Sequence, residues 1–343
     1  MRPEIYKYLT EISKCELLIL AAGFEDRAFQ FVNKSRFSKN AFCILVTFKN
    51  NSSKNQEICT KFKKIINIFF DKLRILEIEI TPDKPQYFEK DLELAILKLP
   101  YEVGDAWVDI SGLPTFAICT TLNVLRSHFK NRHQVIIYTA AKSYFPTFEE
   151  YKIMSKNSKG NVEYLPKSMA MEMADVSMLE TFSGHRSKEG VSCLAIFAGY
   201  DSLRAAGVIE RLNPSMLLLI YGKPATPDLS WRLDLSQELH KKFESTRRTA
   251  IEVVSTLDLN ETLSILESYY ENLFEDYDFT ISPICSKMQV VGVYLFWERY
   301  KEVQLVFPLP VGYDFDRRPQ GSGDTYITYL EPQNSLYHNL QIT

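Results

Sequence analysis

The sequence predicts an α/β protein in which one strand–helix unit with a mainly parallel sheet occurs twice. Three observations predict this class. Short apolar runs alternate with longer segments of helical periodicity, as in strand–helix–strand units. The runs are almost continuously apolar, which is typical of parallel strands that are covered on both faces. Finally, the runs of residues 15–148 recur in the same order in residues 191–315.

The repeat is clearest where each half begins. Residues 17–28 read LLILAAGFEDRA, and residues 193–205 read CLAIFAGYDSLRA. Both are apolar runs that end in glycine and continue with an aromatic residue, an acid and an arginine. Four further pairs follow in the same order at similar spacing, which chance rarely produces: residues 42–46 with 216–220, 75–80 with 251–254, 106–112 with 277–283, and 135–139 with 303–307.

The segments between these runs have helical periodicity. Residues 54–72 are an example, because their apolar side chains recur at spacings of three and four. Similar patterns occur in residues 88–98, 114–129 and 259–274. Alternating strands and helices of these lengths predict two tandem Rossmann-like units, related by internal duplication.

The repeat also predicts the domain boundaries. We expect a first unit over residues 1–148, a connector over residues 149–190 and a second unit over residues 191–343. The alternation of residues 325–330 predicts one edge strand in the tail of the second unit. Three charged residues follow the last strand of that unit and are expected to fold back over its crevice: Arg317, Arg318 and Asp324.

Composition excludes several classes. The 343 residues are 45% hydrophobic and 24% charged, as in a globular protein of about two domains. Forty basic and 43 acidic side chains give a net charge of −3, which argues against general nucleic-acid binding. No apolar run approaches the length of a membrane span, and no secretory signal is recognised. The six cysteines are scattered without metal-ligand spacing, so we expect a reduced, cytoplasmic protein with no metal site.

The predicted topology also predicts where a ligand binds. In a sheet of strand order 3-2-1-4-5, the crevice lies at the carboxyl ends of the first and fourth strands. Residues 23–27 should therefore face residues 109–115 in the first unit. In the second unit, residues 199–204 should face residues 282–287. Each of these loops is expected to lead into a helix N-terminus, which attracts anions.

The residue types in these loops suit a nucleotide-type ligand. Basic side chains bind phosphate, so Arg27, Arg204 and Lys287 are expected to hold the phosphates. We expect Asp109 and the serines of these loops to form hydrogen bonds with the sugar or base, and the aromatic residues to stack on the base. Asp and Ser after a strand are also common helix N-caps, and this structural interpretation remains open. The candidate ligand-binding residues are Phe24, Arg27, Ser111, Thr115, Tyr200, Asp201, Arg204, Ser282, Ser286 and Lys287.

An enzyme is the second hypothesis. The chain lacks the glycine-rich fingerprints of NAD-binding and P-loop proteins, so no cofactor is predicted. A hydrolase or transferase acting on a nucleotide or phosphorylated substrate would use carboxylates as acids, bases or ligands of a hard cation. The candidate catalytic residues are Glu25, Asp26 and Asp109.

A non-catalytic interaction subunit is the third hypothesis. It would contact its partner through an apolar face that contains Tyr294, Phe296 and Trp297.

The duplicated unit, with Ser, Thr and Lys after the fourth strand, resembles the CARF and SAVED domains of prokaryotic antiviral systems. CARF domains often have a Thr-Gly-Gly-Thr-Lys-like turn at this place. Residues 111–115 (SGLPT) and 282–287 (SPICSK) are its approximate counterparts, and the first lacks the lysine. The resemblance implies a cyclic nucleotide or oligonucleotide signal in phage defence, bound by two such units. It also implies an effector protein or a second copy as partner, and no effector segment is recognised in the sequence.

Overall fold

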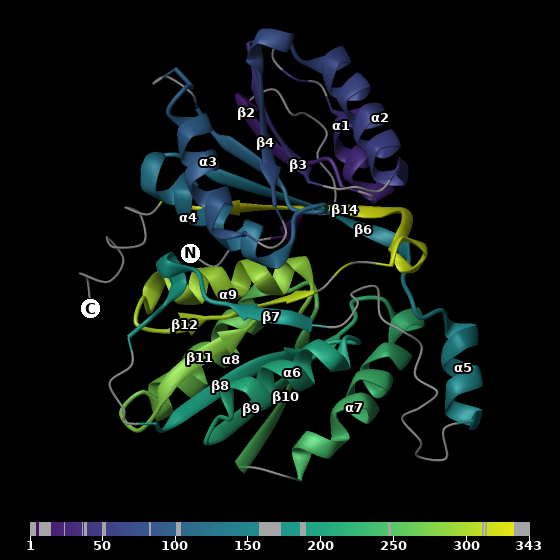
Figure 1. The fold of residues 1–343 in the computed structure, drawn as a ribbon, viewed down its shortest axis with the longest axis vertical. Coiled ribbons are helices and arrows are strands. Elements are labelled where there is room, and N and C mark those ends of the chain that lie inside the picture. Colours follow the sequence, from purple (N-terminus) through teal and green to yellow (C-terminus); the bar gives the residue numbers. More distant parts are fainter. Residues whose placement is uncertain are drawn as a thin grey trace. The chain divides into compact units, whose positions relative to one another are not determined.

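The computed structural model of the chain describes residues 5–6, 15–23, 25–35, 37, 40–49, 53–81, 84–100, 104–157, 173–185, 190–245, 248–310, 312 and 314–332 (Figure 1). The chain forms two compact units. The first comprises Met1–Ser143 and Pro319–Thr343, and the second comprises Tyr144–Arg318.

The first unit contains a seven-stranded sheet of order β1-β14-β6-β5-β2-β3-β4. The five strands from β6 to β4 are parallel, whereas β14 is antiparallel to β6, and β1 is antiparallel to β14. The strands are β1 (Ile5–Tyr6), β2 (Leu17–Ala21), β3 (Phe42–Phe48), β4 (Ile75–Ile80), β5 (Ala106–Asp109), β6 (Gln134–Ser143) and β14 (Gln320–Leu330). The helices are α1 (Gln30–Lys34), α2 (Ser53–Phe69), α3 (Gln86–Ile96) and α4 (Thr115–His128), with 3-10 turns η1 (Asp26–Phe29) and η2 (Lys72–Arg74).

The second unit contains a fully parallel five-stranded sheet of order β10-β9-β8-β11-β12. Its strands are β8 (Ser192–Ala198), β9 (Met216–Lys223), β10 (Arg248–Ser255), β11 (Asp278–Ser282) and β12 (Gln304–Leu305). An antiparallel pair, β7 (Met173–Ser177) and β13 (Phe307–Pro310), forms a separate small sheet. The helices are α5 (Phe148–Asn157), α6 (Ser202–Leu212), α7 (Trp231–Glu244), α8 (Leu259–Leu273) and α9 (Lys287–Arg299), with 3-10 turns η4 (Glu180–Phe182), η5 (Pro227–Leu229) and η6 (Phe315–Arg317).

The predicted fold class is confirmed. The parallel strands of both units follow the order 3-2-1-4-5, which is the order of a Rossmann-like unit. Strands β2 and β8 lie at the centre of their sheets and are almost entirely buried, so their apolar runs pack on both faces. The two units are therefore alike in topology as well as in sequence pattern.

The strand registers correct the predicted repeat at its fourth strand. On its neighbour β5, Leu20 of β2 lies opposite Asp109, and Ile196 of β8 lies opposite Ser282 on β11. Because Leu20 and Ile196 are matched in the repeat, Asp109 corresponds to Ser282. The sequence pattern had matched Ser282 with Ser111 instead. The sequence match is two residues out of register because a short apolar run does not by itself set a register.

The C-terminal strand lies in the first unit and not in the second, where the sequence analysis placed it. Strand β14 pairs with β6 over most of its length, and Ile327 packs into the first unit's core. Asp324 is part of this strand and therefore belongs to the first unit, not to the second as expected. The expected edge position is also wrong, because β1 pairs with the outer side of β14.

The apolar face expected around α9 is part of the core. Tyr294, Phe296 and Trp297 are all buried, and almost every residue of α9 is buried with them. A helix that is apolar on all sides is covered on all sides. These side chains are therefore not an exposed surface for a partner. Among the described residues, no helix is long and apolar enough to cross a membrane.

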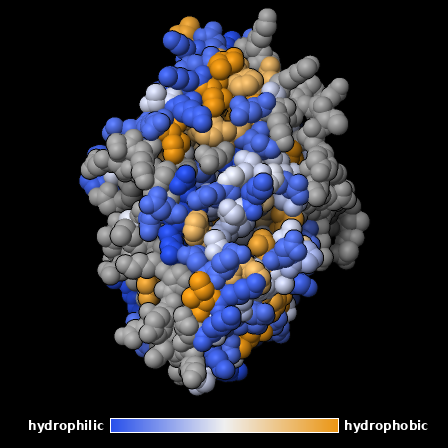
Figure 2. All heavy atoms as spheres, turned by 90° about the vertical axis from the view of Figure 1, so that its right-hand side faces the viewer, coloured by the Kyte–Doolittle hydropathy of each residue, from blue (hydrophilic) through white to orange (hydrophobic). Residues whose placement is uncertain are grey.

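Exposed apolar side chains are spread over the described surface. On the face drawn in Figure 2, hydrophobic residues lie in small groups among hydrophilic ones. Single exposed apolar residues of this kind are normal in globular proteins and indicate no site. The most exposed are Leu73, Ile68, Leu97 and Leu203.

Candidate functional site

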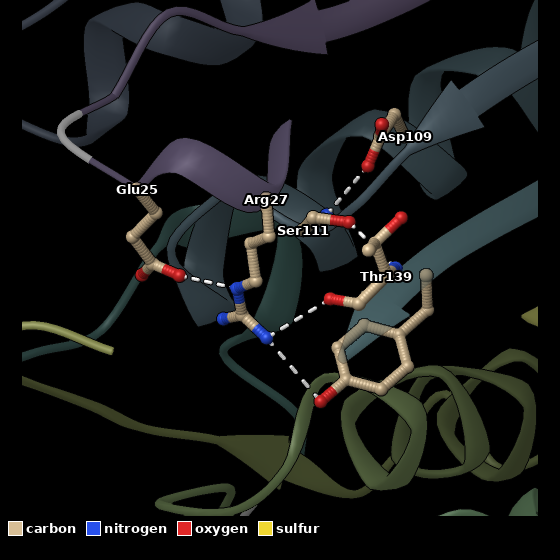
Figure 3. A network of polar contacts seen from close by, with 6 residues as sticks. Glu25, Arg27, Asp109, Ser111 and Thr139 are labelled. Carbon is tan, nitrogen blue, oxygen red and sulfur yellow. Dashed lines mark hydrogen bonds and ion pairs between the residues drawn. The ribbon is translucent and has the colours of Figure 1, made fainter. Parts of the chain in front are cut away.

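The first unit holds Arg27 in a network of polar contacts at the carboxyl edge of its sheet (Figure 3). The guanidinium Nε donates to Glu25 Oε2 at 2.5 Å, and Nη1 donates to the Thr139 carbonyl at 3.2 Å and to Tyr138 Oη at 3.3 Å. The guanidinium also lies 5.5 Å from the Tyr138 ring centroid. Because Arg27 and Glu25 are both buried, the ion pair neutralises a charge that burial would otherwise make costly. Arg27 therefore ties the loop after β2 to β6.

Asp109 and Ser111 lie beside this network, as the predicted switch point requires. Asp109 Oδ1 accepts a hydrogen bond from the Ser111 backbone N–H at 2.9 Å, and Ser111 Oγ accepts one from the Thr139 N–H at 2.8 Å. Asp109 Oδ2 is buried and has no hydrogen-bond partner among the described residues. Burial raises the pKa of Asp109 to about 6, although hydrogen bonding to Ser111 and the charge of Arg27 both oppose the rise.

The remaining candidate residues of the first unit are not part of this polar network as the structure describes it. Thr115 is the first residue of α4 and is half-buried, and the loop before it approaches β2 closely. A Cβ on Gly112 would lie 3.0 Å from the Ala21 carbonyl oxygen, so this turn favours glycine. Phe24 and the side chain of Asp26 lie outside the described residues. Of the three catalytic candidates, Glu25 binds Arg27 and Asp109 keeps one carboxylate oxygen without a partner.

In the second unit, Asp201 caps the N-terminus of α6. Its Oδ1 accepts from the Arg204 backbone N–H at 3.3 Å, and its Oδ2 accepts from Arg204 Nε at 2.5 Å. The carboxylate thus satisfies a helix N–H and neutralises the arginine one turn later. Helix capping and this ion pair account for the positions of both the Asp201 and the Arg204 side chain.

Ser286 caps the N-terminus of α9 in a similar way. Its Oγ accepts from the Gln289 N–H at 3.2 Å, while Gln289 Oε1 accepts from the Ser286 N–H at 3.1 Å, which completes a capping box. The hydroxyl also donates to the Thr256 carbonyl. Lys287 follows as the first residue of the helix and is half-buried.

Ser282 differs from these caps. It ends β11 and is fully buried, and its Oγ has no hydrogen-bond partner among the described residues. A buried hydroxyl without a partner costs free energy, which makes such an atom worth an explanation. Its counterpart in the first unit, Asp109, has the same property at Oδ2. Both switch points therefore keep one buried oxygen that the described side chains leave unpaired.

Arg232 is a further candidate residue that the sequence pattern did not single out. It is the second residue of α7, which follows β9 and so begins near the carboxyl edge of the sheet. Its Nη1 donates to the Pro146 carbonyl and its Nη2 to the Phe145 carbonyl, both at 3.1 Å. Its guanidinium lies 5.6 Å from the Tyr144 ring centroid and 5.2 Å from that of Trp231. It has no carboxylate partner among the described residues, and burial lowers its pKa.

Tyr200 and Arg317 lie near Arg232. Burial raises the pKa of the Tyr200 hydroxyl, and the positive charges of Arg317 and Arg232 oppose this rise. Arg317 Nη1 lies 3.1 Å from Glu150 Oε1, and its guanidinium lies 5.6 Å from the Phe145 ring centroid. Arg317 is therefore close to the Tyr200 loop, as expected from its place after the last strands. We call Tyr144, Tyr200, Trp231, Arg232 and Arg317 the arginine–aromatic cluster.

The sequence held one signal for this cluster. Trp231-Arg232 follows the second strand of its unit at the start of a helical segment, where carboxyl-edge residues are expected. In the described part of the chain, no group of three or more His, Cys, Asp and Glu side chains is close enough to hold a metal ion.

No family model matches the sequence, and no curated protein matches it. Among solved structures, the chain is similar to a DNA nuclease of type III CRISPR defence that is activated by cyclic oligoadenylate, with 10% sequence identity and a TM-score of 0.44. The match covers 82% of this chain and 63% of the nuclease chain. A likeness this distant says nothing about which residues bind a ligand.

Proposed function

We propose that the chain binds a nucleotide-type ligand that carries phosphate, and that the ligand lies at the carboxyl edge of the second unit's sheet. Its resemblance to CARF and SAVED domains favours a cyclic nucleotide or oligonucleotide signal of phage defence. Arg232 is the observation that supports the proposal. It is a partly buried cation that lacks a carboxylate partner among the described residues, at the edge where Rossmann-like units bind ligands.

The chemistry of Arg232 suits a phosphate. A guanidinium has five N–H donors, and Arg232 donates two hydrogen bonds to the carbonyl oxygens of Pro146 and Phe145, which carry no full charge. A phosphate oxygen would supply the missing negative charge, and hydrogen bonds between charged groups are about twice as strong as neutral ones. Arg317 adds a second guanidinium close by.

The aromatic members of the cluster suit a base. The Arg232 guanidinium lies over the rings of Tyr144 and Trp231. Tyr200 follows the central strand β8. Stacking of a base on an aromatic ring contributes about 1–3 kcal/mol and does not depend on the base. Ser282 Oγ, at the end of β11, is the buried group that would accept or donate a hydrogen bond to the sugar or base.

The first unit is a weaker candidate for the phosphate. Arg27 is neutralised by Glu25 and is held by two further acceptors, so a phosphate would have to compete with partners already in place. In the second unit, Arg204 is neutralised by Asp201 in the same manner. We therefore assign the phosphate to Arg232, and Lys287 at the N-terminus of α9 is a second candidate. Arg317 is placed after Arg232 because it pairs with Glu150.

The test is a calorimetric titration of the full chain with inorganic phosphate and with mono-, cyclic and oligonucleotides. We expect one nucleotide class to bind, and Arg232→Met to weaken it about tenfold or more, since a charged hydrogen bond contributes about 1.5–3 kcal/mol. Arg211→Met is the matched control, because Arg211 is an exposed arginine of the same unit that pairs with Asp175. Absence of binding by every member, or equal binding by Arg232→Met, would overturn the proposal.

A hydrolase or transferase is the second candidate, and Asp109 favours it. A buried carboxylic acid with a pKa of about 6 is suited to general acid–base catalysis near neutral pH. This hypothesis predicts turnover of a nucleotide or phosphorylated substrate that Asp109→Asn abolishes while the fold is kept. Unchanged turnover in that variant would remove Asp109 from the mechanism.

A further inference from the structure

Helix α5 contacts the arginine–aromatic cluster through three of its side chains. The ring of Tyr151 stacks on that of Trp231 with the centroids 4.9 Å apart, and the Phe148 centroid lies 5.6 Å from that of Trp231. Glu150 Oε1 lies 3.1 Å from Arg317 Nη1. Every side chain of α5 that the structure describes is exposed or half-buried. The described part of the helix therefore has no buried anchor, and these contacts at the cluster hold it.

The contact between Glu150 and Arg317 is an ion pair without hydrogen-bond geometry. Arg317 Nη1 is buried and has no hydrogen-bond partner among the described residues, although the Glu150 carboxylate lies beside it. The side chains of Arg317 and Glu150 are 23% and 31% exposed, so water screens the pair and weakens it. An anion that offers Nη1 a well-aligned oxygen can therefore compete with Glu150.

The charges of this pair and of Arg232 meet near the Tyr200 hydroxyl. Burial raises the pKa of Tyr200; the charges of Arg317 and Arg232 oppose this rise, whereas that of Glu150 adds to it. Arg232 also donates to the carbonyls of residues 145 and 146, which lie just before α5. A phosphate on Arg232 therefore lies close to the Glu150 carboxylate, and two negative groups in such a place repel each other.

We propose that Glu150 is an internal competitor of the ligand's phosphate, and that ligand binding releases α5 from the arginine–aromatic cluster. This inference rests on the proposed function, because it concerns the regulation of the same site. The phosphate takes the place of the Glu150 carboxylate beside Arg317, and α5 loses the ion pair that holds it there. The position of α5 then depends on whether the site is occupied.

The released helix keeps its N-terminal cap. The Thr147 N–H donates to Glu150 Oε2 at 2.8 Å, and Thr147 Oγ1 accepts from the Glu150 N–H at 3.2 Å, which is a capping box. A helix of ten residues is nevertheless only marginally stable in water without tertiary contacts. Release should therefore speed hydrogen exchange in α5, whereas a ligand ordinarily slows exchange in the segments that it contacts.

The first test needs no ligand and measures hydrogen exchange in residues 148–157. Glu150→Gln removes the charge and keeps an oxygen for the capping box, so we expect exchange there to be about two- to fivefold faster than in the wild-type chain. Glu149→Gln is the matched control, since Glu149 is an exposed glutamate in the same turn of α5. Equal exchange rates in the two variants would overturn the inference.

The second test is a calorimetric titration of the full chain and of both variants with inorganic phosphate and with mono-, cyclic and oligonucleotides. We expect Glu150→Gln to bind at least one of these probes about fivefold more tightly than the wild-type chain, and Glu149→Gln to bind it equally. The same probe should speed exchange of residues 148–157 in the wild-type chain.

The outcomes separate this inference from the proposed function. Binding of equal affinity by all three proteins, or slower exchange of residues 148–157 with the probe bound, would overturn the competition and leave the proposed function standing. No binding by any of the three proteins would overturn the proposed function and this inference with it.

Discussion

Asp109 and Ser282 occupy equivalent positions in the two units. Each lies on the fourth strand of its sheet, opposite matched residues of the first strand, and each keeps one buried oxygen without a described partner. Of the two groups only the carboxyl of Asp109 can carry a charge, so the free-energy cost of burying it depends on pH. The hydroxyl of Ser282 is neutral, so its unit is better placed to receive an anion nearby.

The buried carboxyl of Asp109 predicts a pH-dependent stability. Burial raises its folded-state pKa from an ordinary value of 3.8 to about 6, so between these values the folded chain holds a proton that the unfolded chain loses. The free energy of unfolding should therefore fall as the pH rises from about 4 to about 6, by on the order of 3 kcal/mol. Asp109→Asn should lack this decline.

Denaturant unfolding of both proteins across this pH range measures the effect. The free energy of unfolding of Asp109→Asn should rise relative to that of the wild-type chain as the pH increases. Asp91→Asn, an exposed position on α3, serves as the control. A difference between Asp109→Asn and the wild-type chain that is constant with pH would show that the carboxyl is not buried as described.

The ion pair of Arg27 and Glu25 predicts a large loss on breaking one partner. Arg27→Ala should lower the free energy of unfolding by about 3–5 kcal/mol, because it leaves the Glu25 carboxylate buried without its cation. Arg27→Met with Glu25→Gln removes both charges, so it should lose less than Arg27→Ala. Chemical denaturation of the wild-type chain, Arg27→Ala and the double variant measures these free energies of unfolding. If the double variant loses at least as much stability as Arg27→Ala, the ion pair is not buried.

The capping box of Ser286 predicts a loss of stability without a loss of binding. Ser286→Ala should lower the free energy of unfolding by about 0.5–2 kcal/mol, the usual contribution of an N-cap. Ser286→Asp keeps a capping oxygen and should retain more of the stability. If Ser286 instead contacted phosphate, the added carboxylate would abolish nucleotide binding, so calorimetry on Ser286→Asp separates the two roles.

The close approach of α8 and α9 predicts that Gly292 tolerates no side chain. A Cβ there would lie 2.8 Å from the Leu259 carbonyl oxygen and 2.9 Å from Thr262 Cβ. Gly292→Ala should therefore lower the free energy of unfolding by about 1–3 kcal/mol, the usual cost of overpacking. Gly190→Ser provides a contrast with open space around it but a positive φ, so its cost reflects the backbone alone. A stable Gly292→Ala would contradict the described packing of the two helices.

The central fold was predictable from the sequence because its signals are local. Buried parallel strands such as β2 and β8 are continuous apolar runs, and a helix between two parallel strands makes a right-handed crossover. The position of β14 was not predictable in this way. Its partner strand β6 lies far earlier in the chain, and no pattern in the sequence of residues 320–330 indicates which sheet they join.

The candidate site was predictable to a similar degree. Asp109 and Ser111 follow a strand directly, so the topology alone places them at the carboxyl edge. Arg232 depends on contacts with carbonyls of Phe145 and Pro146, which lie more than 80 residues earlier in the chain. Whether an arginine is neutralised, as Arg204 is by Asp201, likewise depends on side-chain geometry that a residue pattern does not contain.

Hydrogen exchange of the full chain, with and without the nucleotide that binds it, tests the central claim most directly. We expect slower exchange in residues 199–204, 224–232 and 283–290, which follow β8, β9 and β11 at the carboxyl edge of the second sheet. Residues 190–191 and 213–215, which precede β8 and β9, should exchange at unchanged rates. Protection confined to these preceding segments, or to the first unit, would contradict a ligand site at the carboxyl edge of the second unit.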